Sequence, residues 1–142
     1  MAQTSRPPSI RLTAALAALI VIGSSGCDFM LGTDRPESAR VVLDGTVPNG
    51  IDVVTSQEFF RGFSEDGSGS ELAFLQADTA SVTLPFDETY QLGASGWFAV
   101  RVLPPEGDTA RVHLRVIVDG SERFNETATL AGQYIQYFMT HH

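Results

Sequence analysis

The sequence contains a single cysteine, Cys27, three histidines and no lysine among its 142 residues. A lone thiol cannot form an intramolecular disulfide, nor supply the several thiolates of a cysteine-rich zinc site. All nine basic residues are arginines, and seventeen acids give the chain a net charge of −8. Because an acidic surface repels phosphate backbones and anionic headgroups, the composition argues against nucleic-acid binding and against anchoring by a basic patch.

The lone cysteine ends an N-terminal segment with the layout of a secretory signal. Arg6 and Arg11 supply positive charge, and the following eleven residues, 12–22, are apolar except for one threonine. A membrane-spanning helix needs about 17–25 apolar residues, whereas the apolar part of a signal peptide needs about 7–15. Small residues at 23–26 then interrupt the apolar run, so the segment predicts a signal that is removed.

This segment resembles the signal of bacterial lipoproteins. Ser25, Gly26 and Cys27 fit the last three positions of that motif, with Ser24 where a leucine or valine is usual. The resemblance implies a signal peptide over 1–26 and acyl chains on Cys27. It also implies a location in the bacterial cell envelope, facing the periplasm or exterior, with the choice of inner or outer membrane open. The alternative is an ordinary signal peptide cut near residues 23–26, which leaves Cys27 a free thiol.

The remaining 116 residues carry seven arginines and seventeen acids, a net charge of −10, and suit one domain. We expect a lipidated tether over 27–38 and a folded domain over 39–142. From residue 39 onward apolar residues alternate with polar ones, the period of a half-buried strand. Strands are expected near 39–44, 51–55, 81–86, 97–102, 111–118, 121–130 and 133–139; residues 72–76 form a strand or one helical turn, and 57–70 is the least regular part. This pattern predicts an all-β, antiparallel, immunoglobulin-like β-sandwich of about seven strands.

The run 111–118 is the clearest strand, with Val112, Leu114, Val116 and Val118 predicted to face inward. The Asp119-Gly120 pair after it is a strong hairpin signal. A plain two-residue loop would set Phe124 opposite Arg115 on the polar face. One extra residue instead brings Phe124, Ala128 and Leu130 onto the apolar face, so we predict a bulged hairpin with Gly120 in the left-handed conformation.

The mature chain loosely resembles the immunoglobulin-like domain of MmpS-type transport accessory proteins. The shared features are a first strand ending in Gly45, the Leu84-Pro85 step, and a strand closing with Val118-Asp119-Gly120. The resemblance implies an envelope-anchored accessory protein of the kind that assists lipid-exporting pumps. This chain lacks the paired cysteines common in that domain, and its expected anchor is a lipid instead of a helix.

Few residues suggest a catalytic or metal-binding role. His113 lies between Arg111 and Arg115 without an evident nucleophile, and Glu122 or Glu126 are the expected partners of this stripe. The loop 65–71 lacks the alternating ligands of a calcium loop, and two terminal histidines rarely form a metal site. We therefore expect no enzyme activity, no cofactor and no metal.

The aromatic residues are the functional hint. Phe59, Phe60 and Phe63 lie beside the irregular segment, and Trp97 alternates with the apolar residues of its strand. Aromatic residues outside a core often anchor partners, although they also plug the open end of a small sandwich. The favoured hypothesis is a non-catalytic binding or accessory module with an envelope protein partner. The alternative is a small-ligand or carbohydrate-binding lipoprotein that uses these four residues as a platform.

Overall fold

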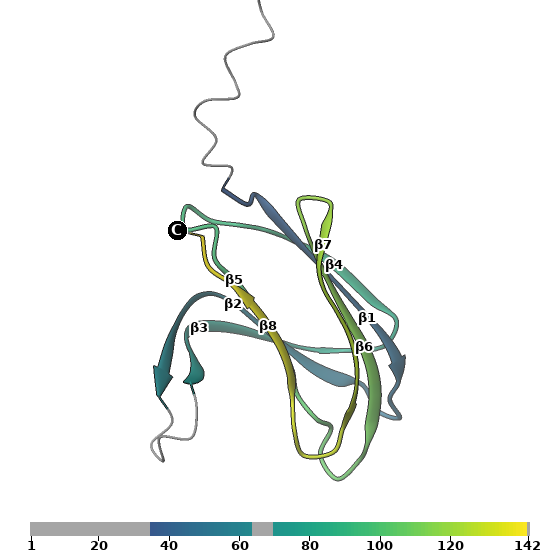
Figure 1. Ribbon diagram of the computed structural model, residues 1–142. Helices are drawn as coiled ribbons and strands as arrows, with labels where there is room; N and C mark the ends of the chain where they lie inside the picture. The colour runs from purple at the N-terminus through teal and green to yellow at the C-terminus, as the bar shows by residue number, and fades with distance from the viewer. Residues whose placement is uncertain (1–34, 64–69, 142) are drawn as a thin grey trace, which may run out of the picture. The chain divides into compact units, whose positions relative to one another are not determined.

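The computed structural model describes residues 35–63 and 70–141, which form eight antiparallel strands in two four-stranded sheets (Figure 1). One sheet has the order β4-β1-β6-β7 and the other the order β3-β2-β5-β8. This all-β arrangement broadly fits the expected immunoglobulin-like sandwich, with one strand more than expected. The strands are β1 (Ser38–Thr46), β2 (Ile51–Phe63), β3 (Ser70–Val82), β4 (Phe86–Gln91), β5 (Phe98–Val102), β6 (Ala110–Val118), β7 (Ser121–Leu130) and β8 (Ile135–Met139).

The core lies between the inner faces of the two sheets. Alternate residues of β1, β2, β5 and β6 are fully buried there, as the period of two predicts. The four inward positions expected on β6 are confirmed. Each fully buried valine or leucine contributes about 1.5–3 kcal/mol relative to exposure. The most deeply buried side chains include Val41, Leu43, Val53, Phe98, Val100, Val102, Val112, Leu114 and Val116.

The β6–β7 hairpin places Phe124 on the predicted face. Phe124 lies opposite Val116, and Phe124, Ala128 and Leu130 all pack against the core. The extra residue that shifts the register is Arg123, because Ile117 still pairs with Glu122 while the next pair is Val116 with Phe124. The bulge therefore lies within the strands instead of in the loop, where we expected it.

The loop itself has two residues, Asp119 and Gly120. Both have positive φ angles, 46° and 77°, so the left-handed conformation predicted for Gly120 is confirmed. Two consecutive positive φ angles give the turn whose twist matches that of the flanking strands. Because this turn closes without an extra residue, the register shift is absorbed further along, as a bulge.

Two expectations about the middle of the chain are wrong. Residues 57–63 are not irregular but continue β2. For residues 72–76, the strand alternative is confirmed, since they lie in the centre of β3. The strand expected over 81–86 does not exist, because β3 ends at Val82 and the chain turns at the cis Leu84–Pro85 bond before β4. Val82, Leu84 and Phe86 alternate because all three pack against the core from around this turn. Residues 64–69 lie outside the described part.

Gly45 does not end the first strand as expected. It lies inside β1, opposite Val112, with a φ angle of 143°. A Cβ atom at this position would lie 2.1 Å from the carbonyl oxygen of Arg111. The glycine is needed for the close approach of β1 and β6, a role that glycine in a strand often has.

The residues just before β1 are held by the domain. The Asp119 carboxylate accepts hydrogen bonds from the backbone N–H groups of Glu37 and Ser38, the latter at 2.9 Å. Leu92 N–H donates to the Glu37 carbonyl at 2.9 Å, and Arg35 Nη1 donates to the Ala94 carbonyl at 2.8 Å. The chain therefore enters the sandwich beside the turn 119–120 and the loop 92–97.

Candidate functional site: the outer aromatic cluster of β3-β2-β5-β8

A bulge in β2 decides which face its aromatic residues occupy. Thr55 pairs with Asp78, but the next pair is Glu58 with Gln76, so β2 holds one extra residue between them. Ser56 is buried at this point, and its hydroxyl lies within hydrogen-bond reach of the Glu58 carbonyl, at 2.8 Å, and of the Gln76 carbonyl. The Ser56 side chain thereby satisfies backbone groups that the interrupted ladder leaves unpaired.

The bulge reverses the face of the strand. Thr55 lies opposite Val100 and faces the inner core, whereas Phe59 packs with Ala99, which points the other way. Without the extra residue, Phe59 would continue the inward face of Thr55. Bulges also bend a strand pair, and both strands of the β2–β3 hairpin curve strongly in Figure 1.

The result is a second hydrophobic cluster on the outer face of the sheet. Phe59, 2% exposed, Leu72 and Ala99 are buried in it, and Phe74, Trp97 and Phe138 pack around them. We call these six residues the outer cluster. The Phe59 ring centroid lies 5.6 Å from that of Trp97 and 6.2 Å from that of Phe138, at tilted and edge-on angles that favour aromatic pairs.

Two arginines cover rings of this cluster. The Arg61 guanidinium lies 4.8 Å from the Phe138 centroid, and that of Arg101 lies 4.7 Å from Phe74 and 4.4 Å from Tyr134. Arg101 also donates to the Leu72 carbonyl at 2.9 Å. Within residues 35–63 and 70–141, neither arginine pairs with a carboxylate. We call the exposed side of this region the aromatic–arginine face; it comprises Arg61, Phe74, Trp97, Arg101, Tyr134 and Phe138.

The structure brings together two of the four residues proposed as a platform. Phe59 and Trp97 are in contact, but Phe60 lies opposite Ala73 on the other face of the hairpin and is 51% exposed. Phe63 ends β2, and its side chain lies outside the described part. The aromatic cluster occupies the outer face of a sheet, instead of closing the open end of the inner core.

Sequence reasoning missed the partners that complete this face. Phe74 lies in the segment 72–76, for which the sequence allows either a strand or a helical turn. Phe138 lies in β8, and Tyr134 lies just before that strand. No sequence pattern marks Arg61 or Arg101 as part of this face, because the rings that their guanidinium groups cover belong to residues far away in the chain. The run of aromatic residues in 133–139 was the available clue, since a strand that is apolar on both faces needs two packing surfaces.

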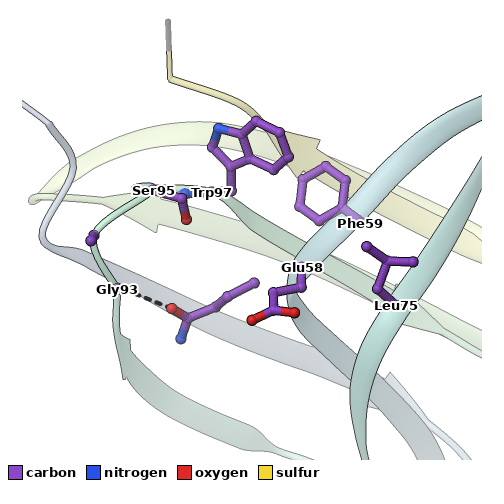
Figure 2. A pocket seen from close by; sticks show the side chains of 8 residues that line it. Glu58, Phe59, Leu75, Gly93, Ser95 and Trp97 are labelled. Atoms are coloured by element: carbon purple, nitrogen blue, oxygen red, sulfur yellow. Dashed lines mark hydrogen bonds between the residues drawn. The ribbon is translucent and has the colours of Figure 1, made fainter.

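A hollow of about 420 Å³ lies beside Trp97 (Figure 2). Phe59, Leu75 and Trp97 supply apolar walls, and the Glu58 carboxylate and the loop 93–95 supply polar ones. The loop is held by the side chain of Gln57, which accepts from Gly93 N–H at 2.7 Å and donates to the Gln91 carbonyl at 2.9 Å.

The other outer face, that of β4-β1-β6-β7, carries paired charges. Arg40 Nε donates to Asp87 at 2.7 Å, and Arg115 lies 3.7 Å from Asp44. The hydrogen bond from Arg40 holds the pKa of Asp87 below its usual value. On the polar face of β6, His113 Nε2 lies 2.7 Å from Asn125 Oδ1, and Asn125 donates to Glu122. Glu122 is thus linked to His113 through an amide and not directly.

Tyr90, in β4 of the same sheet, is half-buried against Phe98. Burial, with a smaller contribution from the nearby Glu88 carboxylate, raises the pKa of Tyr90 to about 12. The phenol is therefore neutral at physiological pH. Across the described residues, no three His, Cys, Asp or Glu side chains are grouped to hold a metal ion.

No protein-family model matches the chain, and no curated protein is similar to it. In the part of the chain that the structure describes, no helix has the length and hydrophobicity to cross a membrane. The arguments below therefore rest on the residues and their geometry.

Proposed function

We propose that this chain is a lipid-anchored protein of the bacterial cell envelope whose immunoglobulin-like sandwich is a non-catalytic binding or accessory module. The anchor is an acylated Cys27 at the end of the signal segment, and the bilayer is its first partner. A second partner is an envelope protein. Seven residues, 28–34, separate Cys27 from Arg35, whose side chain donates to the Ala94 carbonyl; the two Cα atoms can be at most about 29 Å apart. That short span would hold the domain close to the membrane surface.

The observation that carries the binding function is the aromatic–arginine face. A guanidinium stacked on a ring keeps N–H donors in its plane available for an acceptor. Arg61 makes no hydrogen bond or ion pair within residues 35–63 and 70–141, and Tyr134 beside Arg101 is 43% exposed. Tyrosine, tryptophan and arginine are the residue types enriched where binding energy concentrates in protein interfaces.

The anchor is tested by replacing its cysteine. The wild-type protein should partition into the detergent phase, and Cys27→Ser should release the protein or leave the precursor uncut. Recovery of the wild type as a soluble periplasmic protein with a cleaved signal would contradict lipidation and support the ordinary signal peptide.

The binding face is tested by site-specific crosslinking in the cell. A photoreactive amino acid at position 134 should yield one dominant crosslinked protein. The same group at Thr127, exposed on the outer face of the other sheet, is the matched control and should yield none. Equal crosslinking from both positions, or none from either, would contradict a partner on the aromatic–arginine face.

The hollow beside Trp97 favours the second candidate, a small-ligand or carbohydrate-binding lipoprotein. Ligand sites are concave and largely apolar with a few placed polar groups, and this hollow combines three apolar side chains with a carboxylate. A sugar or lipid that raises the melting temperature of the wild type, and raises it less in Trp97→Ala, would support this function. If no sugar or lipid raises the melting temperature, the small-ligand function is contradicted and the module that binds an envelope protein is retained.

A further inference from the structure

The loop that forms one wall of the hollow is held in place by hydrogen bonds from neighbouring side chains and backbone groups. Gln57 uses its amide oxygen on Gly93 and its amide nitrogen on the Gln91 carbonyl. Trp97 N–H donates to Ser95 Oγ at 3.2 Å, and Trp97 Nε1 donates to the His141 carbonyl at 3.3 Å. The wall is therefore pre-shaped by these hydrogen bonds.

A second set of contacts fixes the loop from behind. Gly96 N–H donates to the Gly93 carbonyl at 3.0 Å, and the Ala94 carbonyl accepts from Arg35. Gly96 has a φ angle of 63°, and a Cβ atom there would lie 2.6 Å from Arg35 Cγ. Any side chain at position 96 would push the loop off the incoming chain, so this geometry requires glycine.

The hollow presents a carboxylate beside apolar and aromatic side chains. The Glu58 carboxylate makes no hydrogen bond or ion pair within residues 35–63 and 70–141, and Figure 2 shows it beside the hollow with Phe59, Leu75 and Trp97. Leu75 is 65% exposed. Tryptophan and phenylalanine faces carry partial negative charge, and tryptophan is the best ring for a cation.

From these residues we infer that the hollow binds an organic ammonium group, a positively charged nitrogen that carries apolar substituents. Charge would meet Glu58 and the rings, and methyl or methylene groups would meet Leu75 and Phe59. The net charge of −8 attracts such a ligand and repels anions. A neutral sugar fits less well, because it has no positive charge to pair with the Glu58 carboxylate. This inference rests on the small-ligand function proposed for the same site.

The test uses Trp97, which is the only tryptophan of the chain and therefore an unmixed fluorescence reporter. Choline is titrated into the purified domain beside 3,3-dimethyl-1-butanol, its neutral isostere with carbon in place of nitrogen. Choline should change Trp97 emission saturably and bind about fivefold to tenfold more tightly than the alcohol, as expected for one cation–π contact and one exposed ion pair.

The protein side of the test replaces the carboxylate. Glu58→Gln should lower the affinity for choline about threefold to fivefold and leave the affinity for the alcohol unchanged. Glu126→Gln, an exposed acid on β7 in the other sheet, is the matched control and should leave both unchanged. Equal affinity for choline and alcohol, or equal choline affinity in both variants, would overturn the ammonium assignment. Glucose binding more tightly than choline would also overturn it.

Failure of this inference can be told apart from failure of the proposed function. The crosslinking at position 134 reports on a protein partner and does not depend on the hollow. A crosslinked partner without choline binding would remove the ammonium site alone. Choline binding without a crosslink would retain the site and remove the protein partner.

Discussion

The arginines on the two outer faces of the sandwich have different neighbours. On β4-β1-β6-β7, Arg40 and Arg115 lie against the carboxylates of Asp87 and Asp44. On β3-β2-β5-β8, Arg101 stacks between rings and no carboxylate approaches it in the described residues. The faces therefore differ in what lies against the guanidinium, a carboxylate on one and an aromatic ring on the other. Arg101 also donates from Nε and Nη2 to the Gln136 side chain and the Leu72 carbonyl. Arg61, stacked on Phe138, makes no hydrogen bond or ion pair in the described residues and retains its donors for another acceptor.

The difference originates in the depth of apolar packing. The outer face of β4-β1-β6-β7 has charged groups over a single apolar layer. The outer face of β3-β2-β5-β8 has an additional layer, because the β2–β3 hairpin brings Phe59 and Leu72 onto Ala99. An outward-facing apolar layer in an acidic protein is costly to expose unless it serves packing or recognition. The comparison therefore supports the proposal that the second face is the one that binds a partner.

The largest expected effect concerns the inner core that both sheets share. Leu114 is 0% exposed, so Leu114→Ala should lower the free energy of unfolding by about 2–5 kcal/mol. Ile117→Ala, on the outer face of the same strand, is the control and should cost less than about 1.5 kcal/mol. Urea unfolding measures both values. Equal losses of unfolding free energy in the two variants would show that the inner face of β6 is no more buried than its outer face.

The next effect tests whether the outer cluster is a true second core. Phe59→Ala should cost about 3 kcal/mol and shift Trp97 emission to longer wavelength, because the ring that shields Trp97 is removed. Its neighbour Phe60 is largely exposed on the other face, so Phe60→Ala should change stability by less than about 0.5 kcal/mol. If the two variants behave alike, the face reversal at the Ser56 bulge is contradicted.

A smaller effect separates the two kinds of arginine. Arg101→Met should cost about 1–2 kcal/mol, since it removes two ring contacts and the hydrogen bonds to the Leu72 carbonyl and the Gln136 side chain. Arg40→Met removes an exposed ion pair and should cost less than Arg101→Met, because water screens the pair. In 1 M salt the Arg40 effect should shrink while the Arg101 effect persists. The same salt dependence in both variants would remove the distinction between the faces.

The smallest effect concerns the contacts at the chain entry. Desolvation opposes ionisation of Asp119, but the hydrogen bonds from the Ser38 and Glu37 backbone outweigh it, and the pKa of Asp119 falls below its ordinary 3.8. Because the pKa of Asp119 is lower in the folded protein than in the unfolded chain, ionised Asp119 stabilises the fold at pH values above 3.8. This stabilisation is lost as the pH falls through the lower pKa of the folded protein. Asp119→Asn, which tolerates the positive φ angle, should cost about 1 kcal/mol at pH 7.

The pH dependence of that variant is the decisive measurement. The difference in melting temperature between wild type and Asp119→Asn should diminish as the pH falls below about 3.8. A difference that stays constant from pH 7 to pH 2.5 would mean that the charge of Asp119 plays no part in holding the entry segment.

Much of the inner architecture could be predicted from the sequence. Period-two alternation identified β1, β5, β6 and β7, and the requirement to bury Phe124 indicated the register of the β6–β7 hairpin. The same alternation misled at Val82, Leu84 and Phe86, because a turn packed on the core places apolar residues at the same spacing. It also gave no warning that residues 57–63 continue β2, since a bulge interrupts the pattern there.

What the sequence by itself determined is local: the turn at Asp119-Gly120 and the inward faces of the regular strands. Each depends on residues close together in the chain. Only the tertiary structure decided that Phe59 faces outward, that Trp97, Phe138 and Phe74 surround it, and that two arginines cover these rings. The physical reason is that side-chain alternation carries information only as far as the next bulge. The Ser56 bulge is stabilised by the carbonyl of Gln76, on a different strand twenty residues further along the chain.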